Sequence, residues 1–231
     1  VDTVTWTSSS AGASTSLDPG SVDATANDDE ANFCEAQLNY GDKDQQGTPG
    51  QQNPLCDTSG MCMDKGGLRP TVAPLAADVT ITEWMANPDG GGTVSDTNGE
   101  WFEILFAADA DLNGLQLGKV FEPELNVQET LGGIECIRVT AGTHVLFARN
   151  TDTNVNGGLP DTAIDTNISL TNSNSSIFVA IEDQILDSVT YAASTAGEST
   201  QIDGAGQTCN GTTPYGAGDL GTPGAANPDC I

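Results

Sequence analysis

The sequence has 231 residues, which is enough for one or two domains with a core of ordinary size. Its 33 acidic residues against 6 lysines and arginines give a formal net charge of −27, which repels nucleic acid phosphates and anionic membranes. This excludes a polyanion-binding function and leaves divalent cations, cationic partners or solubility in salt. No run of 18 apolar residues occurs, so we expect no membrane insertion.

The first third of the chain divides into three parts. Residues 1–7 (VDTVTWT) alternate apolar and polar side chains, which predicts a half-buried strand. Residues 18–56 are polar and rich in Gly and Pro turns, which predicts ordered loop. Residues 57–77 carry two prolines and no periodicity, so we interpret them as a linker.

The remainder, residues 78–231, contains short apolar segments separated by Gly, Asn and Asp. None of them offers an 11-residue helical stripe, and many short strands between turns favour an all-β sandwich or barrel. The predicted strands are residues 79–85, 100–106, 115–117, 134–139, 144–148, 177–181 and 186–191.

The end of the chain repeats its beginning. Residues 1–19 and 186–204 are identical at nine of nineteen positions. After them Cys, Tyr-Gly, GTPG, Asn-Pro and Cys recur in the same order, with a one-residue indel before GTPG and an acidic insert at residues 21–31. A repeat of this length indicates one whole domain and the tail of a predecessor. We therefore expect residues 1–56 to be the C-terminal part of a preceding repeat, followed by the linker and the complete domain at 78–231.

The six cysteines indicate an oxidising compartment, and the repeat predicts how they pair. Equivalent cysteines of two copies should pair equivalently, which gives Cys34–Cys56 and Cys209–Cys230 and leaves Cys62 and Cys136 for each other. Zinc is the rival interpretation, but no CxxC pair occurs and the chain has one histidine.

Several motifs resemble the bacterial lamin-tail domain family, in the order of that family. They are ITEWMANP (81–88), GEWFEILF (99–106), DADLNGLQL (109–117), HVLFARN (144–150), NISLTNSNSSIFVAI (167–181), LDSVTYA (186–192) and GTPGAANP (221–228). The resemblance covers nearly all of residues 78–230, and residues 1–56 resemble only the last third of the family.

This resemblance implies an immunoglobulin-like β-sandwich from a secreted or cell-surface protein, often repeated or appended to an enzyme, with binding or anchoring roles. It implies no shared active site. Cys62, Cys136 and the strong acidic bias depart from the general pattern of the family.

Calcium is the one cofactor that the residues suggest. Asp152, Asn154 and Asn156 precede Gly157 as in an oxygen-rich calcium loop, with Asp161 and Asp165 downstream. Residues 109–114 repeat the pattern, and residues 89–98 do so more weakly. No glutamate stands at the twelfth position and no helices flank the loops, so turn formation by Asn and Asp is the alternative.

Other polar and aromatic side chains have a functional and a structural interpretation. Glu83 and Glu103 form a candidate acid–base pair, but buried acceptors of backbone and hydroxyl hydrogen bonds are the expected role. His144 lies in an apolar segment, where a structural role is expected over catalysis. Three aromatic side chains are candidate ligand contacts if they are exposed together: Trp84, Trp101 and Tyr191.

These observations predict no enzyme. We expect a structural or adhesive module of an extracellular or cell-surface repeat protein, with neighbouring copies or adjacent repeats as partners. Either the sequence is a segment of an array, or adjoining chains complete one another by strand donation into a head-to-tail filament. The alternative is an accessory targeting or ligand-binding domain of a secreted enzyme or surface receptor.

Overall fold

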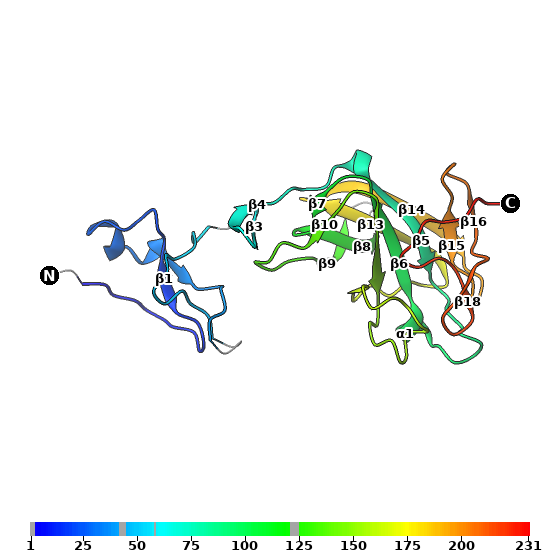
Figure 1. The fold of residues 1–231 in the computed structure, drawn as a ribbon, viewed down its shortest axis with the longest axis horizontal. Helices are drawn as coiled ribbons and strands as arrows, with labels where there is room; N and C mark the ends of the chain where they lie inside the picture. The colour runs from blue at the N-terminus through cyan, green and yellow to red at the C-terminus, as the bar shows by residue number, and fades with distance from the viewer. Residues whose placement is uncertain (1–2, 42–44, 58, 121–124) are drawn as a thin grey trace. The chain divides into compact units, whose positions relative to one another are not determined.

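The computed structural model describes residues 3–41, 45–57, 59–120 and 125–231 (Figure 1). Over these residues the chain is predominantly β, as the sequence predicts. It forms two compact units: unit 1 is Val1–Thr71 with Gly133–Cys136, and unit 2 is Val72–Gly132 with Ile137–Ile231. The boundary therefore falls inside the expected linker. Residues 1, 2 and 42–44 of the expected N-terminal repeat fragment lie outside the described residues.

Two antiparallel sheets form the body of unit 2. The first has six strands in the order β12-β11-β6-β5-β15-β16, with only β11 and β12 parallel, and the second has four in the order β14-β13-β8-β9. Their bounds are β5 (Val79–Met85), β6 (Trp101–Phe106), β8 (Leu115–Val120), β9 (Asn126–Thr130), β11 (Thr143–Ala148), β12 (Ile164–Asp165), β13 (Ser173–Ile181), β14 (Gln184–Ala193), β15 (Thr200–Ile202) and β16 (Thr208–Asn210).

Shorter elements complete unit 2. Two-stranded sheets pair β7 (Ala110–Asp111) with β10 (Arg138–Val139) and β17 (Pro214–Tyr215) with β18 (Asp219–Leu220). A 3-10 turn, η3 (Ala76–Asp78), precedes β5, and the single-turn helix α1 (Asp96–Gly99) precedes β6.

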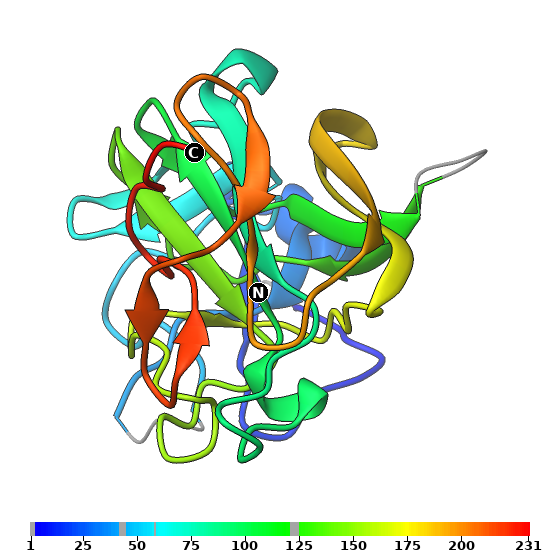
Figure 2. The same ribbon diagram turned by 90° about the vertical axis from the view of Figure 1, so that its right-hand side faces the viewer.

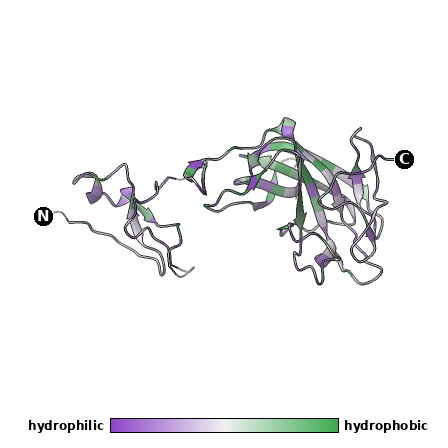
Figure 3. Ribbon diagram, viewed as in Figure 1, coloured by the Kyte–Doolittle hydropathy of each residue, from purple (hydrophilic) through white to green (hydrophobic). Residues whose placement is uncertain are grey.

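The two larger sheets share one hydrophobic core, so unit 2 is a β-sandwich. Phe102 and Ile104 of β6 contribute to it from one sheet, and Leu117 and Val179 from the other, each at most 1% exposed. Figure 3 shows hydrophobic residues along these strands and hydrophilic ones in many of the loops. Burying one such side chain stabilises the fold by about 2 kcal/mol.

The six-stranded sheet also has a covered outer face. Alternate side chains of β5 and β6 point away from the main core, and Met85 and Trp101 form a smaller cluster there with Leu146, Ala148 and Leu159. The C-terminal residues lie over this face, as the red segment beside the green strands shows (Figure 2). Both faces of β6 are therefore buried, which explains its nearly continuous apolar sequence.

Unit 1 holds two small antiparallel pairs: β1 (Thr15–Leu17) with β2 (Phe33–Glu35), and β3 (Met61–Asp64) with β4 (Gly67–Pro70). Two 3-10 turns, η1 (Ala26–Asp28) and η2 (Glu30–Asn32), lie in the acidic insert. The expected linker thus contains the β3–β4 hairpin, whose turn includes Gly67 at a φ of +110°. The lack of periodicity in four-residue strands conceals such a hairpin.

Two strand predictions differ from the structure. Residues 3–7 are not a strand, although their sequence alternates. Only Arg138–Val139 of the predicted 134–139 strand belongs to a sheet, because residues 133–136 join unit 1. There the amide of Met63 donates to the carbonyl of Ile134 at 2.6 Å, and the amide of Cys136 to that of Met63 at 2.9 Å.

The later part of the repeat folds alike in both copies, over the described residues of 12–56 and residues 197–230. Strands β1 and β2 pair in the register Ser16↔Cys34, and β15 and β16 pair in the equivalent register Gln201↔Cys209. The amide of Gln46 donates to Gly12 and that of Leu220 to Gly197, both at 2.7 Å. Disulfides join Cys34 to Cys56, Cys209 to Cys230 and Cys62 to Cys136, as the repeat and elimination predict.

Candidate functional site

The candidate site is a pair of glutamates on the outer face of the six-stranded sheet. Glu83 of β5 lies directly across from Glu103 of β6, and both are 0% exposed. The register shifts between Ile81 and Glu83, so two residues of β5 oppose one of β6. This β-bulge turns Thr82 as well as Glu83 toward Glu103.

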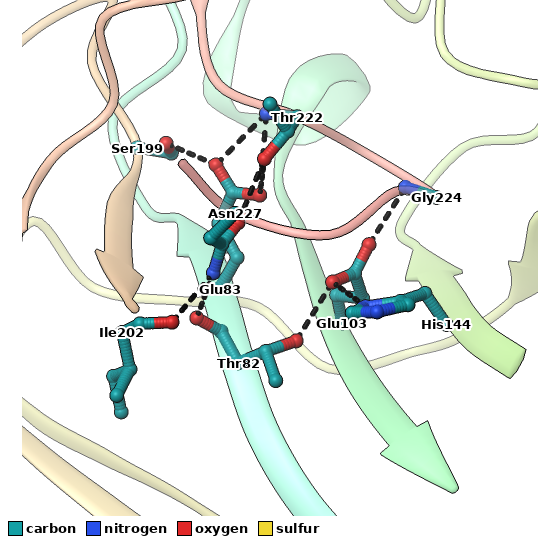
Figure 4. A network of polar contacts seen from close by, with 9 residues as sticks. All are labelled: Thr82, Glu83, Glu103, His144, Ser199, Ile202, Thr222, Gly224 and Asn227. Atoms are coloured by element: carbon teal, nitrogen blue, oxygen red, sulfur yellow. Dashed lines mark hydrogen bonds and ion pairs between the residues drawn. The ribbon is translucent and has the colours of Figure 1, made fainter. Parts of the chain in front are cut away.

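The two carboxylates bind the backbone of the C-terminal segment, defined here as residues 221–230 (Figure 4). Glu83 accepts hydrogen bonds from the amide of Thr222 at 3.0 Å, from its hydroxyl at 2.9 Å and from the hydroxyl of Ser199. Glu103 accepts from the amide of Gly224 at 2.7 Å. The pair therefore holds a turn whose two amides face the sheet.

Glu103 has two further partners. Its Oε1 accepts from the hydroxyl of Thr82 and meets Nδ1 of His144, each at 2.7 Å. Together with the bonds from the C-terminal segment, each of the four carboxylate oxygens of the pair has a protein partner. This confirms the expected role of both glutamates as buried acceptors.

Burial determines the electrostatics of the pair. Removing Glu83 from water disfavours its charged form and raises its pKa to about 7, against the lowering effect of its hydrogen bonds to Ser199 and Thr222. The hydrogen bond to Glu103 raises the pKa of His144. A protonated His144 offsets the charge of Glu103, so the site carries less than two full negative charges near neutral pH.

Asn227 and a disulfide fix the rest of the C-terminal segment. The side-chain amide of Asn227 donates to the carbonyls of Thr82 at 2.8 Å and Ile202 at 2.9 Å. Its oxygen accepts from the hydroxyl of Thr222 at 2.7 Å. The Cys209–Cys230 disulfide then closes the segment onto β16. Three side chains, those of Glu83, Glu103 and Asn227, thus bind one turn.

Sequence reasoning found the two glutamates and His144 but missed Ser199, Thr222, Gly224 and Asn227. A signal for them exists within the chain, because each recurs in the first copy of the repeat as Ser14, Thr48, Gly50 and Asn53. Their common role becomes visible only when residues some 120 positions apart are placed together.

The aromatic candidates do not form a surface. Trp84 is 3% exposed, Trp101 1% and Tyr191 8%. Trp84 packs against Tyr191 with ring centroids 5.7 Å apart, and the indole N–H of Trp101 donates to the hydroxyl of Tyr215 at 2.9 Å. Because all three are buried, they are not ligand contacts, and the receptor hypothesis loses the residues on which it was based.

The calcium candidates at 152–165 are used in part by their own loop. Asp152 accepts from the amide of Asn154 at 3.0 Å, and Asn156, 1% exposed, accepts from the amides of Gly158 and Leu159. In the described part of the chain, the carboxylates of Asp152, Asp161 and Asp165 do not gather within 4.8 Å. Calcium binding here stays a prediction, and melting with and without chelator tests it.

The second calcium candidate, residues 109–114, accepts hydrogen bonds from the backbone of neighbouring segments. The amide of Val72 donates to Asp111 at 2.8 Å, and that of Ile137 to Asn113 at 2.9 Å. Capping of backbone amides by Asp111, the alternative interpretation of this loop, is confirmed.

Three disulfides are typical of a protein from an oxidising environment. No helix in the described ranges is long and apolar enough to cross a membrane. Comparison with protein-family models, curated proteins and solved structures gives no match.

Proposed function

We propose that this chain is a non-catalytic structural module of an extracellular or cell-surface repeat protein, in which β-sandwiches of one kind follow one another and neighbouring modules are the partners. The observation that carries the proposal is the repeated end segment. The described residues of 12–56 have the strand register and disulfide of residues 197–230. A chain that ends two modules in the same way is organised in series.

We further propose that unit 2 is an immunoglobulin-like sandwich of the bacterial lamin-tail kind. The support is the position of the resembling motifs: ITEWMANP includes most of β5, GEWFEILF includes β6, and GTPGAANP lies over the paired glutamates. The motifs of the resemblance thus coincide with the strands and the turn that build the sandwich.

The disulfides suit a module that carries tension. Cys62 and Cys136 close a loop of 74 positions that includes β5, β6, β8 and β9. Tension applied at the two chain ends passes through this disulfide and bypasses those four strands. Loop closure of this length also stabilises the fold by about 4 kcal/mol in chain-entropy terms.

Single-molecule stretching of the full chain tests this proposal. We expect a discrete unfolding event for unit 2, and a released length greater by about 330 Å under reductant, because the 74-position loop and the 21-position loop closed by Cys209 and Cys230 then both extend. The double variant Cys62→Ala/Cys136→Ala should release about 260 Å of this length without reductant. Extension with no unfolding event, or the same length in both conditions, would contradict the mechanical role. Saturable binding to a polysaccharide would then favour the accessory targeting alternative.

A further inference from the structure

Unit 1 exposes a groove beside its N-terminal residues and the β1–β2 pair. The groove encloses about 560 Å³, and Val4, Trp6 and Phe33 line it together with polar side chains and the carboxylates of Glu30 and Glu35. Trp6 is 65% exposed. An exposed tryptophan in such a groove marks an interaction surface.

The equivalent aromatic residues of unit 2 show what is missing. Trp6 corresponds to Tyr191, which is 8% exposed because it packs against Trp84 of β5. Tyr40, 43% exposed, corresponds to Tyr215, which packs edge-on against Trp101 of β6 with ring centroids 6.1 Å apart. Both aromatic side chains of unit 1 therefore lack the partners that β5 and β6 provide in unit 2.

The backbone of unit 1 lacks the same partners. In unit 2 the amides of Thr222 and Gly224 donate to Glu83 and Glu103. Their equivalents, the amides of Thr48 and Gly50, have no acceptor within the residues that the structure describes. The N–H groups of Thr48 and Gly50 are separated only by Pro49, which has no N–H. They present partial positive charge, to which a pair of carboxylates is complementary.

One strand edge is open as well. In unit 2, β15 pairs with β16 on one side and with β5 on the other, through Thr200↔Trp84 and Gln201↔Glu83. In unit 1, β1 pairs with β2 but has no strand on its other side within the described ranges. An open edge of this kind accepts an added strand through backbone hydrogen bonds.

We propose that unit 1 is a docking surface for an antiparallel strand pair of the β5–β6 kind, contributed by a second β-sandwich of this type. The occupant has a tryptophan and a glutamate on each strand: the glutamates bind the amides of Thr48 and Gly50, and the tryptophans cover Trp6 and Tyr40. The inference rests on the proposed serial arrangement, and it adds which chemical groups join one module to the end segment of another.

Fluorescence of Trp6 gives a direct readout of docking in the full chain. Trp84 and Trp101 are buried, so iodide quenches mainly Trp6. The probe is a synthetic peptide of residues 79–106 in which both tryptophans are replaced by phenylalanine, added in 0.5 M salt to screen charge repulsion. We expect saturable protection of Trp6 from iodide. A peptide that also carries Gln in place of Glu83 and Glu103 should bind at least tenfold more weakly, because each replacement removes a charge-assisted hydrogen bond.

A second measurement keeps the peptide and varies unit 1. In calorimetry of the full chain with this peptide, Trp6→Ala should weaken binding tenfold or more, whereas Val155→Ala on exposed unit 2 surface should not. Unprotected Trp6, equal binding of the Glu and Gln peptides, or undiminished binding by Trp6→Ala would overturn the proposal. Stretching of unit 2 is independent of either result.

Discussion

The carboxyl of Glu83 links the stability of unit 2 to pH. Its pKa is about 7 in the folded chain and 4.5 ordinarily, because burial disfavours the charge. The folded state therefore binds this proton more tightly than the unfolded state. The stabilisation is fully present below about pH 4.5 and is lost as pH rises to about 7 and beyond.

The variant Glu83→Gln tests this link. The glutamine side chain cannot ionise, so the free energy of unfolding of the variant should lack this fall between pH 5 and pH 8. Relative to the variant, the natural chain should lose stability over that interval, in urea denaturation followed by the fluorescence of the buried tryptophans. Glu182→Gln, at an exposed carboxylate of unit 2, is the control and should keep the natural pH dependence. Parallel pH curves for Glu83→Gln and the natural chain would contradict the assignment.

His144 contributes a second pH dependence of the same sign. Its pKa is raised by the hydrogen bond to Glu103, so the stabilisation is present below its ordinary value of 6.5 and is lost as pH rises through the raised value. His144→Gln keeps a hydrogen-bond donor but no titrating group. We expect this variant to be less stable than the natural chain at pH 5.5 and to approach it at pH 8.5. A constant difference between the two would show that His144 does not titrate in the folded chain.

At the scale of elements, Asn227 and Asn53 offer a matched comparison. The side-chain amide of Asn227 donates to Thr82 and Ile202, whereas within the described residues that of Asn53 donates only to Leu17, the equivalent of Ile202. Asn227→Ala removes both of these partly buried hydrogen bonds and should cost about 2–3 kcal/mol in the unfolding of unit 2. Asn53→Ala should leave unit 2 unchanged, and equal effects of the two variants on unit 2 would contradict the assigned bonds.

The sequence identifies the strands whose side chains alternate or are continuously apolar. Strands β5, β6, β11, β13 and β14 were predicted within a few residues. Strands β1–β4, β7, β9, β12 and β15–β18 were not predicted because they have two to five residues, too few for a pattern, and their pairing depends on neighbours and disulfides. Residues 3–7 show the converse: the pattern of a strand is present, but no strand of the described chain pairs with it.

The candidate site was predictable only in part for the same reason. Two glutamates inside apolar strands stand out in a sequence, because ionisable groups there need partners. The partners are backbone amides of a Gly-Thr-Pro-Gly turn, which carry no chemical signature of their own. The bulge at Ile81–Glu83, which aims Thr82 at Glu103, is also not visible in the sequence.

At the scale of the whole chain, the two units differ in what stabilises them. Among the described residues of unit 1, only Ala36 and Cys62 are buried apolar side chains, whereas unit 2 has the main core of the sandwich. A segment with so small a core depends on its disulfides, each worth about 3–4 kcal/mol. Unit 1 should therefore unfold on reduction under conditions in which unit 2 persists.

Limited proteolysis with and without reductant measures this difference. Reduction should make residues 3–57 susceptible to cleavage while the fragment beginning near residue 72 stays intact, as mass spectrometry of the products would show. The double variant Cys34→Ala/Cys56→Ala should reproduce the cleavage without reductant. Simultaneous digestion of both units would show that unit 2 also depends on its disulfides.

Residue-specific amide hydrogen exchange tests most directly the central claim, that unit 1 is the same end segment as in unit 2 without the strands that complete it. Three pairs of equivalent backbone amides donate to equivalent carbonyls: those of Ser14 and Ser199, of Ala36 and Gly211, and of Gln46 and Leu220. Each member of these pairs should be protected from exchange. Thr222 and Gly224, bound to the glutamates, should exchange slowly, and Thr48 and Gly50 rapidly. Slow exchange at Thr48 and Gly50 in the isolated chain, or rapid exchange at Ser14, Ala36 and Gln46, would contradict the account.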